Sequence, residues 1–191
     1  MTKYILHGGY TKEDNESNQA FFVEFFKDVP DNGTVLFVYF ATRIDEEIPE
    51  KFREHVKICE KFSTERNLNF KIATQENFLE QLKESDALLF NGGSTSKLLR
   101  VLCEYPDLKP LVTGKTVAGS SAGAYILATL GASHSEEVVR EGLGFVPLRV
   151  ICHYESPTLP PSMASVANLK EISPDLELVI LRDYEWRVFR Y

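Results

Sequence analysis

The stretch "KTVAGSSAGAYILATL" (residues 115–130) decides the fold of this chain. It begins with residues that favour a β-strand, continues with six small residues, "GSSAGA", and ends in an apolar segment. This order predicts a buried strand, a tight turn and then a helix over the remaining residues to 130. A strand that turns directly into a helix is the basic unit of α/β proteins, in which helices connect parallel strands.

Strand-like and helix-like segments alternate along the rest of the chain. The apolar, strand-like runs lie at residues 3–7, 33–41, 68–73, 86–90, 148–154 and 176–183. The helix-like segments lie at residues 17–29, 48–62 and 76–85, and "EWRVFRY" (185–191) is typical of the last arm of a hairpin. The alternation predicts a single α/β domain over residues 1–191, with a mostly parallel sheet covered by helices on both faces.

The composition excludes several classes of partner. The chain has 191 residues and a formal net charge of -7, without a cluster of Lys and Arg, which argues against nucleic acid or an anionic membrane surface as a partner. The three cysteines are odd in number and form no CxxC motif, as is typical of a reduced, cytoplasmic protein. No apolar run approaches the ~18 residues of a membrane span, and the N-terminus turns polar too early for a signal peptide.

The two adjacent serines of the turn raise the question of a nucleophile. The frame G-x-S-x-G fits Ser121, with Gly119 and Gly123 on either side, whereas Ser120 has alanines at the corresponding positions. In this motif a sharp strand-to-helix turn exposes the serine, and the next backbone N–H, that of Ala122, can stabilise an oxyanion. The alternatives are a plain turn of small residues or a phosphate-binding loop.

A nucleophilic serine needs a histidine as its base, and the chain has four. His153 ends the strand-like run 148–154, so it should reach the same sheet edge as Ser121. His7 ends the first strand, His55 lies in a charged helix where we expect it to be solvated, and His134 lies in a polar segment. The sequence therefore favours His153 as the base.

The carboxylate that would orient the histidine is not decided by the residues themselves. Candidates between the serine and the histidine are Glu136, Glu137 and Glu141, and Glu155 follows the histidine closely. Each of these has the alternative of a solvated surface charge.

Three segments together resemble the serine peptidases related to dipeptidase E and cyanophycinase. They are "FNGGSTSKLL" (90–99), "AGSSAGA" (118–124) and "GLGFVPLRVICHY" (142–154). The resemblance spans residues 3 to 183 and implies a flavodoxin-like fold of the class I glutamine amidotransferase-like type. It also implies hydrolase activity without a metal or cofactor.

The resemblance assigns roles to particular residues. Ser121 corresponds to the nucleophile and His153 to the general base, and the backbone N–H groups of the turn at Gly92 and Gly93 would form an oxyanion hole with that of Ala122. The acid of dipeptidase E-like members lies about fifteen positions after the nucleophile, which indicates Glu136, with Glu137 next. In the glycine turn, Ser94 replaces the usual Asn.

The expected function is therefore hydrolysis of short peptides, including Asp-X or isopeptide bonds. An acidic substrate would need a cation, and Lys97, Arg140 and Arg149 are the candidates. A non-catalytic binding module on the same fold and an esterase remain alternatives. The expected partner is a small peptide, and the oligomeric state stays open between a monomer and a homodimer.

Overall fold

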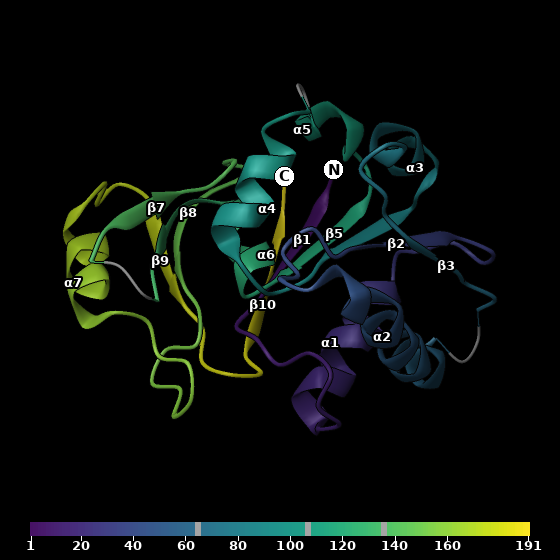
Figure 1. The fold of residues 1–191 in the computed structure, drawn as a ribbon, viewed down its shortest axis with the longest axis horizontal. Coiled ribbons are helices and arrows are strands. Elements are labelled where there is room, and N and C mark those ends of the chain that lie inside the picture. Colours follow the sequence, from purple (N-terminus) through teal and green to yellow (C-terminus); the bar gives the residue numbers. More distant parts are fainter. Residues whose placement is uncertain (64–65, 106–107, 135–136) are drawn as a thin grey trace.

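The computed structural model describes residues 1–63, 66–105, 108–134 and 137–191 as an α/β fold, as predicted (Figure 1). Its larger sheet has six strands in the order β10-β1-β5-β4-β2-β3, and all neighbours are parallel except β10 and β1. These strands are β1 (Lys3–His7), β2 (Thr34–Val38), β3 (Asn69–Ile72), β4 (Ala87–Phe90), β5 (Thr116–Ser120) and β10 (Trp186–Arg190).

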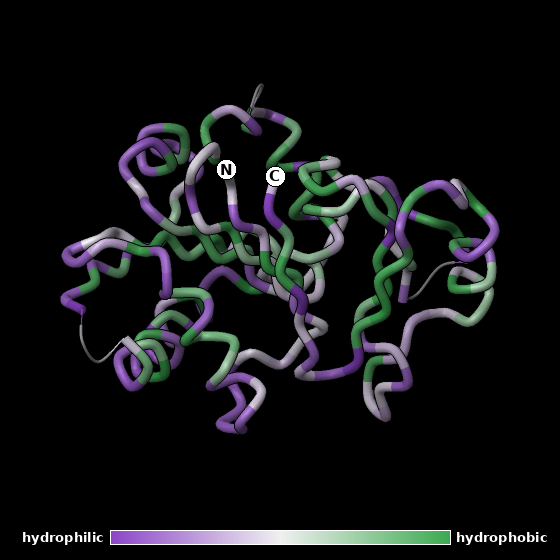
Figure 2. The backbone as a smooth tube through the Cα atoms, turned by 180° about the vertical axis from the view of Figure 1, so that it is seen from behind, coloured by the Kyte–Doolittle hydropathy of each residue, from purple (hydrophilic) through white to green (hydrophobic). Residues whose placement is uncertain are grey.

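Helices cover both faces of the larger sheet because the side chains of each strand alternate between two apolar layers. In β2, Val35 and Phe37 face α1 and α2, whereas Leu36 and Val38 face the layer of α3, α4 and α6. The helical segments are α1 (Glu16–Phe26), η1 (Asp45–Glu47), α2 (Ile48–Phe62), α3 (Phe78–Glu84), α4 (Thr95–Leu102), α5 (Leu108–Leu111), α6 (Ala122–Leu127) and α7 (Met163–Glu171). Figure 2 shows the hydrophobic stretches gathered in the central strands.

A second, smaller sheet holds strands β6 to β9, where the sequence had predicted one sheet. Its order is β7-β6-β8-β9, and β8 runs parallel to both of its neighbours. The strands are β6 (Ala128–Ala132), β7 (Val139–Glu141), β8 (Val146–Ile151) and β9 (Glu177–Ile180). Helix α7 packs on this sheet through Val166 and Leu169.

Two segments differ from their predicted structure. The helix expected to extend to residue 130 ends at Leu127, because residues 128–132 pair with β8 as strand β6. A short apolar run does not distinguish these two outcomes by itself. The expected hairpin arm instead forms β10, which pairs with β1 at the edge of the larger sheet, so both termini lie on neighbouring strands (Figure 1).

This topology gathers the loops that follow parallel strands at one edge. The loops after β1, β2, β4 and β5 emerge together, and those after β8 and β9 emerge together from the smaller sheet. Ligands of open α/β sheets bind outside this carboxyl edge. Among the described residues, no helix is long and apolar enough to cross a membrane.

Candidate active site

Ser121 occupies a strained turn between β5 and α6. Its backbone has φ 51° and ψ −109°, a conformation that few residues other than glycine adopt, and its N–H donates to the carbonyl of His7 at 2.9 Å. The flanking glycines are required: a Cβ on Gly119 would lie 2.4 Å from the carbonyl of Gly123, and one on Gly123 would lie 2.0 Å from that of Phe90. This is the geometry that the G-x-S-x-G frame predicts.

Gly92, Gly93 and Ala122, which the resemblance assigns to an oxyanion hole, lie around Ser121. Gly92 follows β4, and a methyl group on it would lie 3.4 Å from Ser121 Cβ and 3.9 Å from Oγ. Gly93 has φ +143° and leaves no room for a side chain, because a Cβ there would meet the Ala41 carbonyl. Ala122 is the first residue of α6, where N–H groups have no acceptor within the helix. An oxyanion hole at these residues stays a prediction.

His153 lies two residues beyond β8 and is paired with a carboxylate. Its Nδ1 is 2.6 Å from Oδ1 of Asp183, which follows the parallel neighbour β9. The carboxylate accepts the Nδ1–H, so Nε2 is available to accept a proton. Burial lowers the pKa of His153 below its usual 6.5, while the hydrogen bond and the charge of Asp183 act in the opposite direction.

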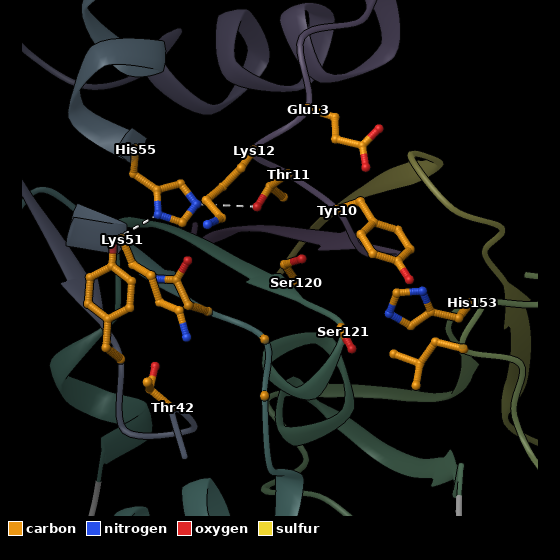
Figure 3. Close-up of a pocket in the computed structure, with 15 residues that line it drawn as sticks. Tyr10, Thr11, Lys12, Glu13, Thr42, Lys51, His55, Ser120, Ser121 and His153 are labelled. Carbon is orange, nitrogen blue, oxygen red and sulfur yellow. Dashed lines mark hydrogen bonds between the residues drawn. The ribbon is translucent and has the colours of Figure 1, made fainter. Parts of the chain in front are cut away.

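A cavity of about 320 Å³ brings Ser121 and His153 together (Figure 3). Ser121 also lines a second cavity of about 650 Å³, whose walls include Arg43, His134 and Leu159. Leu159 belongs to both cavities. The serine therefore lies where two chambers meet, which suits a substrate that extends to both sides of the reacting bond.

Of the carboxylates proposed from the sequence, the described Glu137, Glu141 and Glu155 do not contact His153. Glu136 lies outside the described residues; Glu137 is exposed, and Glu155 pairs with Arg182 at 2.8 Å. Among the described residues, the carboxylate that contacts His153 is that of Asp183. The signal for it was present in the sequence, because "LELVILRD" (176–183) ends in an acidic residue after a strand, as "LRVICHY" ends near His153.

The loop after β1 forms one wall of the first cavity, and a buried histidine fixes it. His7 Nδ1 accepts from the N–H of Gly9 at 3.0 Å, and its Nε2 lies 2.9 Å from Oδ1 of Asn18. The amide nitrogen of Asn18 donates to the carbonyls of Tyr10 and Glu13, so its oxygen must accept from Nε2–H. His7 is therefore neutral, with its proton on Nε2, and serves to hold this wall.

This wall packs against the ring of His153. A Cβ on Gly9 would lie 2.0 Å from the ring, so only glycine fits there. The Tyr10 ring meets the His153 ring edge-on, with centroids 5.1 Å apart, and the Tyr10 hydroxyl lies 2.5 Å from that of Thr158. Loops after β1 and β8 thus meet over His153 and restrict its orientation.

His55 is buried, and the prediction that it is solvated was wrong. Its Nδ1 lies 2.7 Å from the hydroxyl of Tyr39, its Nε2 lies 3.4 Å from that of Thr11, and its ring lines the first cavity. In the sequence His55 lies next to the apolar stripe of α2. Its side chain is buried because it contacts Tyr39, which follows β2. Burial lowers the pKa of His55 to about 3, so it is neutral.

Buried histidines make stability depend on pH, and His7 and His55 have the largest shifts. Burial lowers the pKa of His7 to about 4 and that of His55 to about 3, from 6.5. Between these pKa values and pH 6.5, the two histidines are protonated in the unfolded chain but neutral in the folded protein. The free energy of unfolding is therefore highest above about pH 6.5 and falls as the pH is lowered. We expect urea unfolding to show a loss of about 2 kcal/mol per histidine from pH 7 to 5. His55→Gln should lose the contribution of one histidine, about 2 kcal/mol, from this dependence; an unchanged dependence would contradict this.

The cations considered for an acidic substrate have structural partners. Lys97 donates to the Thr42 carbonyl and to Asp45, both at 2.8 Å, and the buried Arg149 donates to backbone carbonyls around the end of α7. Arg140 donates to Ser96 and lines a separate cavity. None of these three cations is among the described residues that line the two cavities at Ser121. The described residues also contain no group of three or more His, Cys, Asp or Glu side chains placed to hold a metal ion.

The fold and the sequence are both similar to those of known proteins. The chain is similar in structure to a peptidase from an acI-B1 Actinobacterium, with a TM-score of 0.72 at 20% identity over 100% of this chain and 84% of that one. It is also similar to a candidate peptidase E protein from Listeria monocytogenes EGD-e, with a TM-score of 0.67 at 18% identity over 100% of this chain and 95% of that one. No curated protein matches the sequence. The profile of peptidase family S51 matches residues 4–189, so the chain belongs to this family of serine peptidases.

Proposed function

We propose that this chain hydrolyses short peptides with Ser121 as nucleophile, His153 as general base and Asp183 as the carboxylate that orients the histidine. The observation that carries the proposal is the 2.6 Å bond between Asp183 and His153, in a cavity that His153 shares with the strained Ser121. In this triad Asp183 takes the place that the sequence had given to Glu136. Residues 1–191 would act as one domain, with a small peptide as the partner.

The first half of the reaction forms an acyl-enzyme. Ser121 Oγ attacks the peptide carbonyl carbon while its proton moves to Nε2 of His153, and the carbonyl oxygen takes the negative charge. In this proposal the backbone N–H groups of Gly92, Gly93 and Ala122, which surround Ser121, stabilise that oxyanion. The C–N bond then breaks, and Nε2–H gives its proton to the leaving amine.

The second half repeats these steps with water. A water molecule gives a proton to His153 Nε2 and attacks the acyl carbon, and the ester bond to Ser121 Oγ breaks as the proton returns to the serine. Asp183 stays ionised and stabilises the imidazolium in both halves. The contacts of Gly9 and Tyr10 with the histidine ring hold it in place throughout.

The geometry favours this function over a binding module. Positive φ at both Ser121 and His153 stores backbone strain, and such strain in a cavity is typical of reacting residues. The paired Asp183 further gives the histidine the tautomer that a base requires. An esterase would use the same residues, so only its substrates would distinguish it from a peptidase.

The test is hydrolysis of a dipeptide panel with acidic, neutral and β-aspartyl first residues, together with a simple acyl ester. We expect turnover of peptides by the wild type. Turnover of the ester without any peptide would favour the esterase. A folded protein that turns over neither class would reject catalysis and favour the binding module.

The pH dependence of the rate reports on His153. The base must be neutral, so kcat/KM should rise with pH through the pKa of His153, which burial places below 6.5. In Asp183→Asn the raising influence of the carboxylate is lost, so the midpoint of this acid limb should move to still lower pH. A wild-type midpoint above 6.5, or a limb unmoved in Asp183→Asn, would contradict the assignment.

A further inference from the structure

The floor of the first cavity is a row of residues at the ends of adjacent strands. Ser120 ends β5 and Asn91 follows β4, and the pairing of Phe90 with Gly119 makes them lateral neighbours. The pairing of Val38 with Phe90 places Tyr39 next in the row. Lateral neighbours on adjacent strands lie about 4.8 Å apart with side chains on one face, close enough for two of them to bind one small polar group.

Three buried polar groups of this cavity have no partner in the described part of the chain. Ser120, Asn91 and Thr42 are only 3%, 4% and 3% exposed, yet Ser120 Oγ, Thr42 Oγ1 and Asn91 Oδ1 accept and donate no hydrogen bond there. Within that part of the chain, the fully enclosed side-chain atom without a partner is His134 Nε2, so these three oxygens must reach the cavity surface. Because these oxygens face the cavity and are not bonded to the described residues, a ligand bound there could form hydrogen bonds with all three.

The cavity is also lined by charged side chains, and both of its lysines are already paired with carboxylates. Lys12 and Lys51 are 41% and 33% exposed and pair with Glu54 at 2.6 Å and Glu47 at 2.7 Å. Glu13 is exposed and accepts from the hydroxyl of Tyr184. A carboxylate bound at the floor would lose its water and would have to compete with Glu54 and Glu47 for these lysines, and burial of an unpaired charge is costly.

We propose that this floor binds the side chain of the residue on the acyl side of the scissile bond, and that this side chain is a carboxamide, as in Asn or Gln. A carboxamide N–H can donate to Asn91 Oδ1, and its oxygen can accept from the hydroxyl of Ser120 or Thr42. A carboxylate has no hydrogen for Asn91, and an apolar side chain leaves all three oxygens unpaired.

The acyl side follows from the proposed function, on which this inference rests. His153 must protonate the leaving amine, so the leaving group lies on the side of His153. Ser120 and Thr42 lie on the other side of Ser121 (Figure 3). The floor therefore faces the acyl residue.

The inference is tested by binding to Ser121→Ala, measured by calorimetry at neutral pH. Asn-Leu, Asp-Leu and Leu-Leu form one series of similar size, and Gln-Leu, Glu-Leu and Met-Leu a second. We expect the amide member of at least one series to bind about tenfold or more tighter than its partners, because a site built to hydrogen-bond a polar group rejects analogues that cannot reciprocate. Thr42→Val, added to Ser121→Ala, should reduce this preference, whereas Thr113→Val, an exposed threonine outside the cavity, should not.

The outcomes separate this inference from the proposed function. Equal or tighter binding of the acidic or apolar members in both series, or no binding at all, overturns the carboxamide pocket. Wild-type hydrolysis of the same peptides is measured in parallel. If the peptides are hydrolysed but the amide members do not bind more tightly, the peptidase proposal stands and the carboxamide pocket is rejected. If the amide members bind more tightly but no peptide is hydrolysed, the pocket stands and the peptidase proposal is rejected.

Discussion

Ser121→Ala is expected to lower kcat for peptide hydrolysis by about 10⁴-fold or more, because no other group then attacks the carbonyl carbon. The fold should be unaffected: the backbone bonds from Ser121 N–H to His7 and from Tyr125 N–H to Ser121 do not involve the side chain. Steady-state kinetics on the best dipeptide, with circular dichroism of both proteins, measures this.

Ser173→Ala is the matched control for this change. Ser173 also has positive φ, 48°, and lies outside both cavities that include Ser121. The control also removes a serine hydroxyl from a residue with positive φ, but away from the cavities, and should keep wild-type activity. If Ser121→Ala retained a substantial part of the wild-type kcat, Ser121 would not be the nucleophile.

Asp183→Asn is expected to lower kcat by about 10²–10⁴-fold. The Asp183 carboxylate accepts the Nδ1–H of His153 over 2.6 Å and so leaves the Nε2 lone pair free to take the proton of Ser121. An amide can donate to Nδ1 instead, which favours the tautomer with the proton on Nε2, and this tautomer cannot act as the base. Single-turnover kinetics separates this effect on chemistry from any effect on product release.

Two further variants decide between the candidate carboxylates. Asp175→Asn makes the same change at an exposed position and should leave the rate unchanged. Glu136→Gln removes the carboxylate that the resemblance indicates. A large loss in Glu136→Gln together with a small one in Asp183→Asn would return the role of the acid to Glu136.

The sequence predicted the parts of the site that depend on local geometry. The turn at Ser121 needs small residues because its strand and helix nearly touch, and the glycines at 119 and 123 record this need. His153 was predicted from its place after a strand, but the expectation that it shares a sheet edge with Ser121 was wrong, because β8 belongs to the smaller sheet and β5 to the larger one. The alternating segments likewise predicted an α/β fold.

The parts that the sequence did not predict depend on which strands pair. Asp183 reaches His153 because β9 lies beside β8, a pairing between segments that begin about 30 residues apart. The β-strand at residues 128–132 and the pairing of β10 with β1 also come from tertiary contacts that override local pattern. His55 was misplaced for the same reason, since its partners Tyr39 and Thr11 lie on other elements.

The central claim is that Ser121 is a nucleophile activated by His153, and the most direct test is covalent labelling with a fluorophosphonate, mapped by peptide mass spectrometry. We predict a single phosphonylated residue, Ser121, at a rate that falls steeply in His153→Ala and in Asp183→Asn, with no label in Ser121→Ala. Absence of label from the folded wild-type protein, or label on the neighbouring Ser120 in its place, would contradict the account.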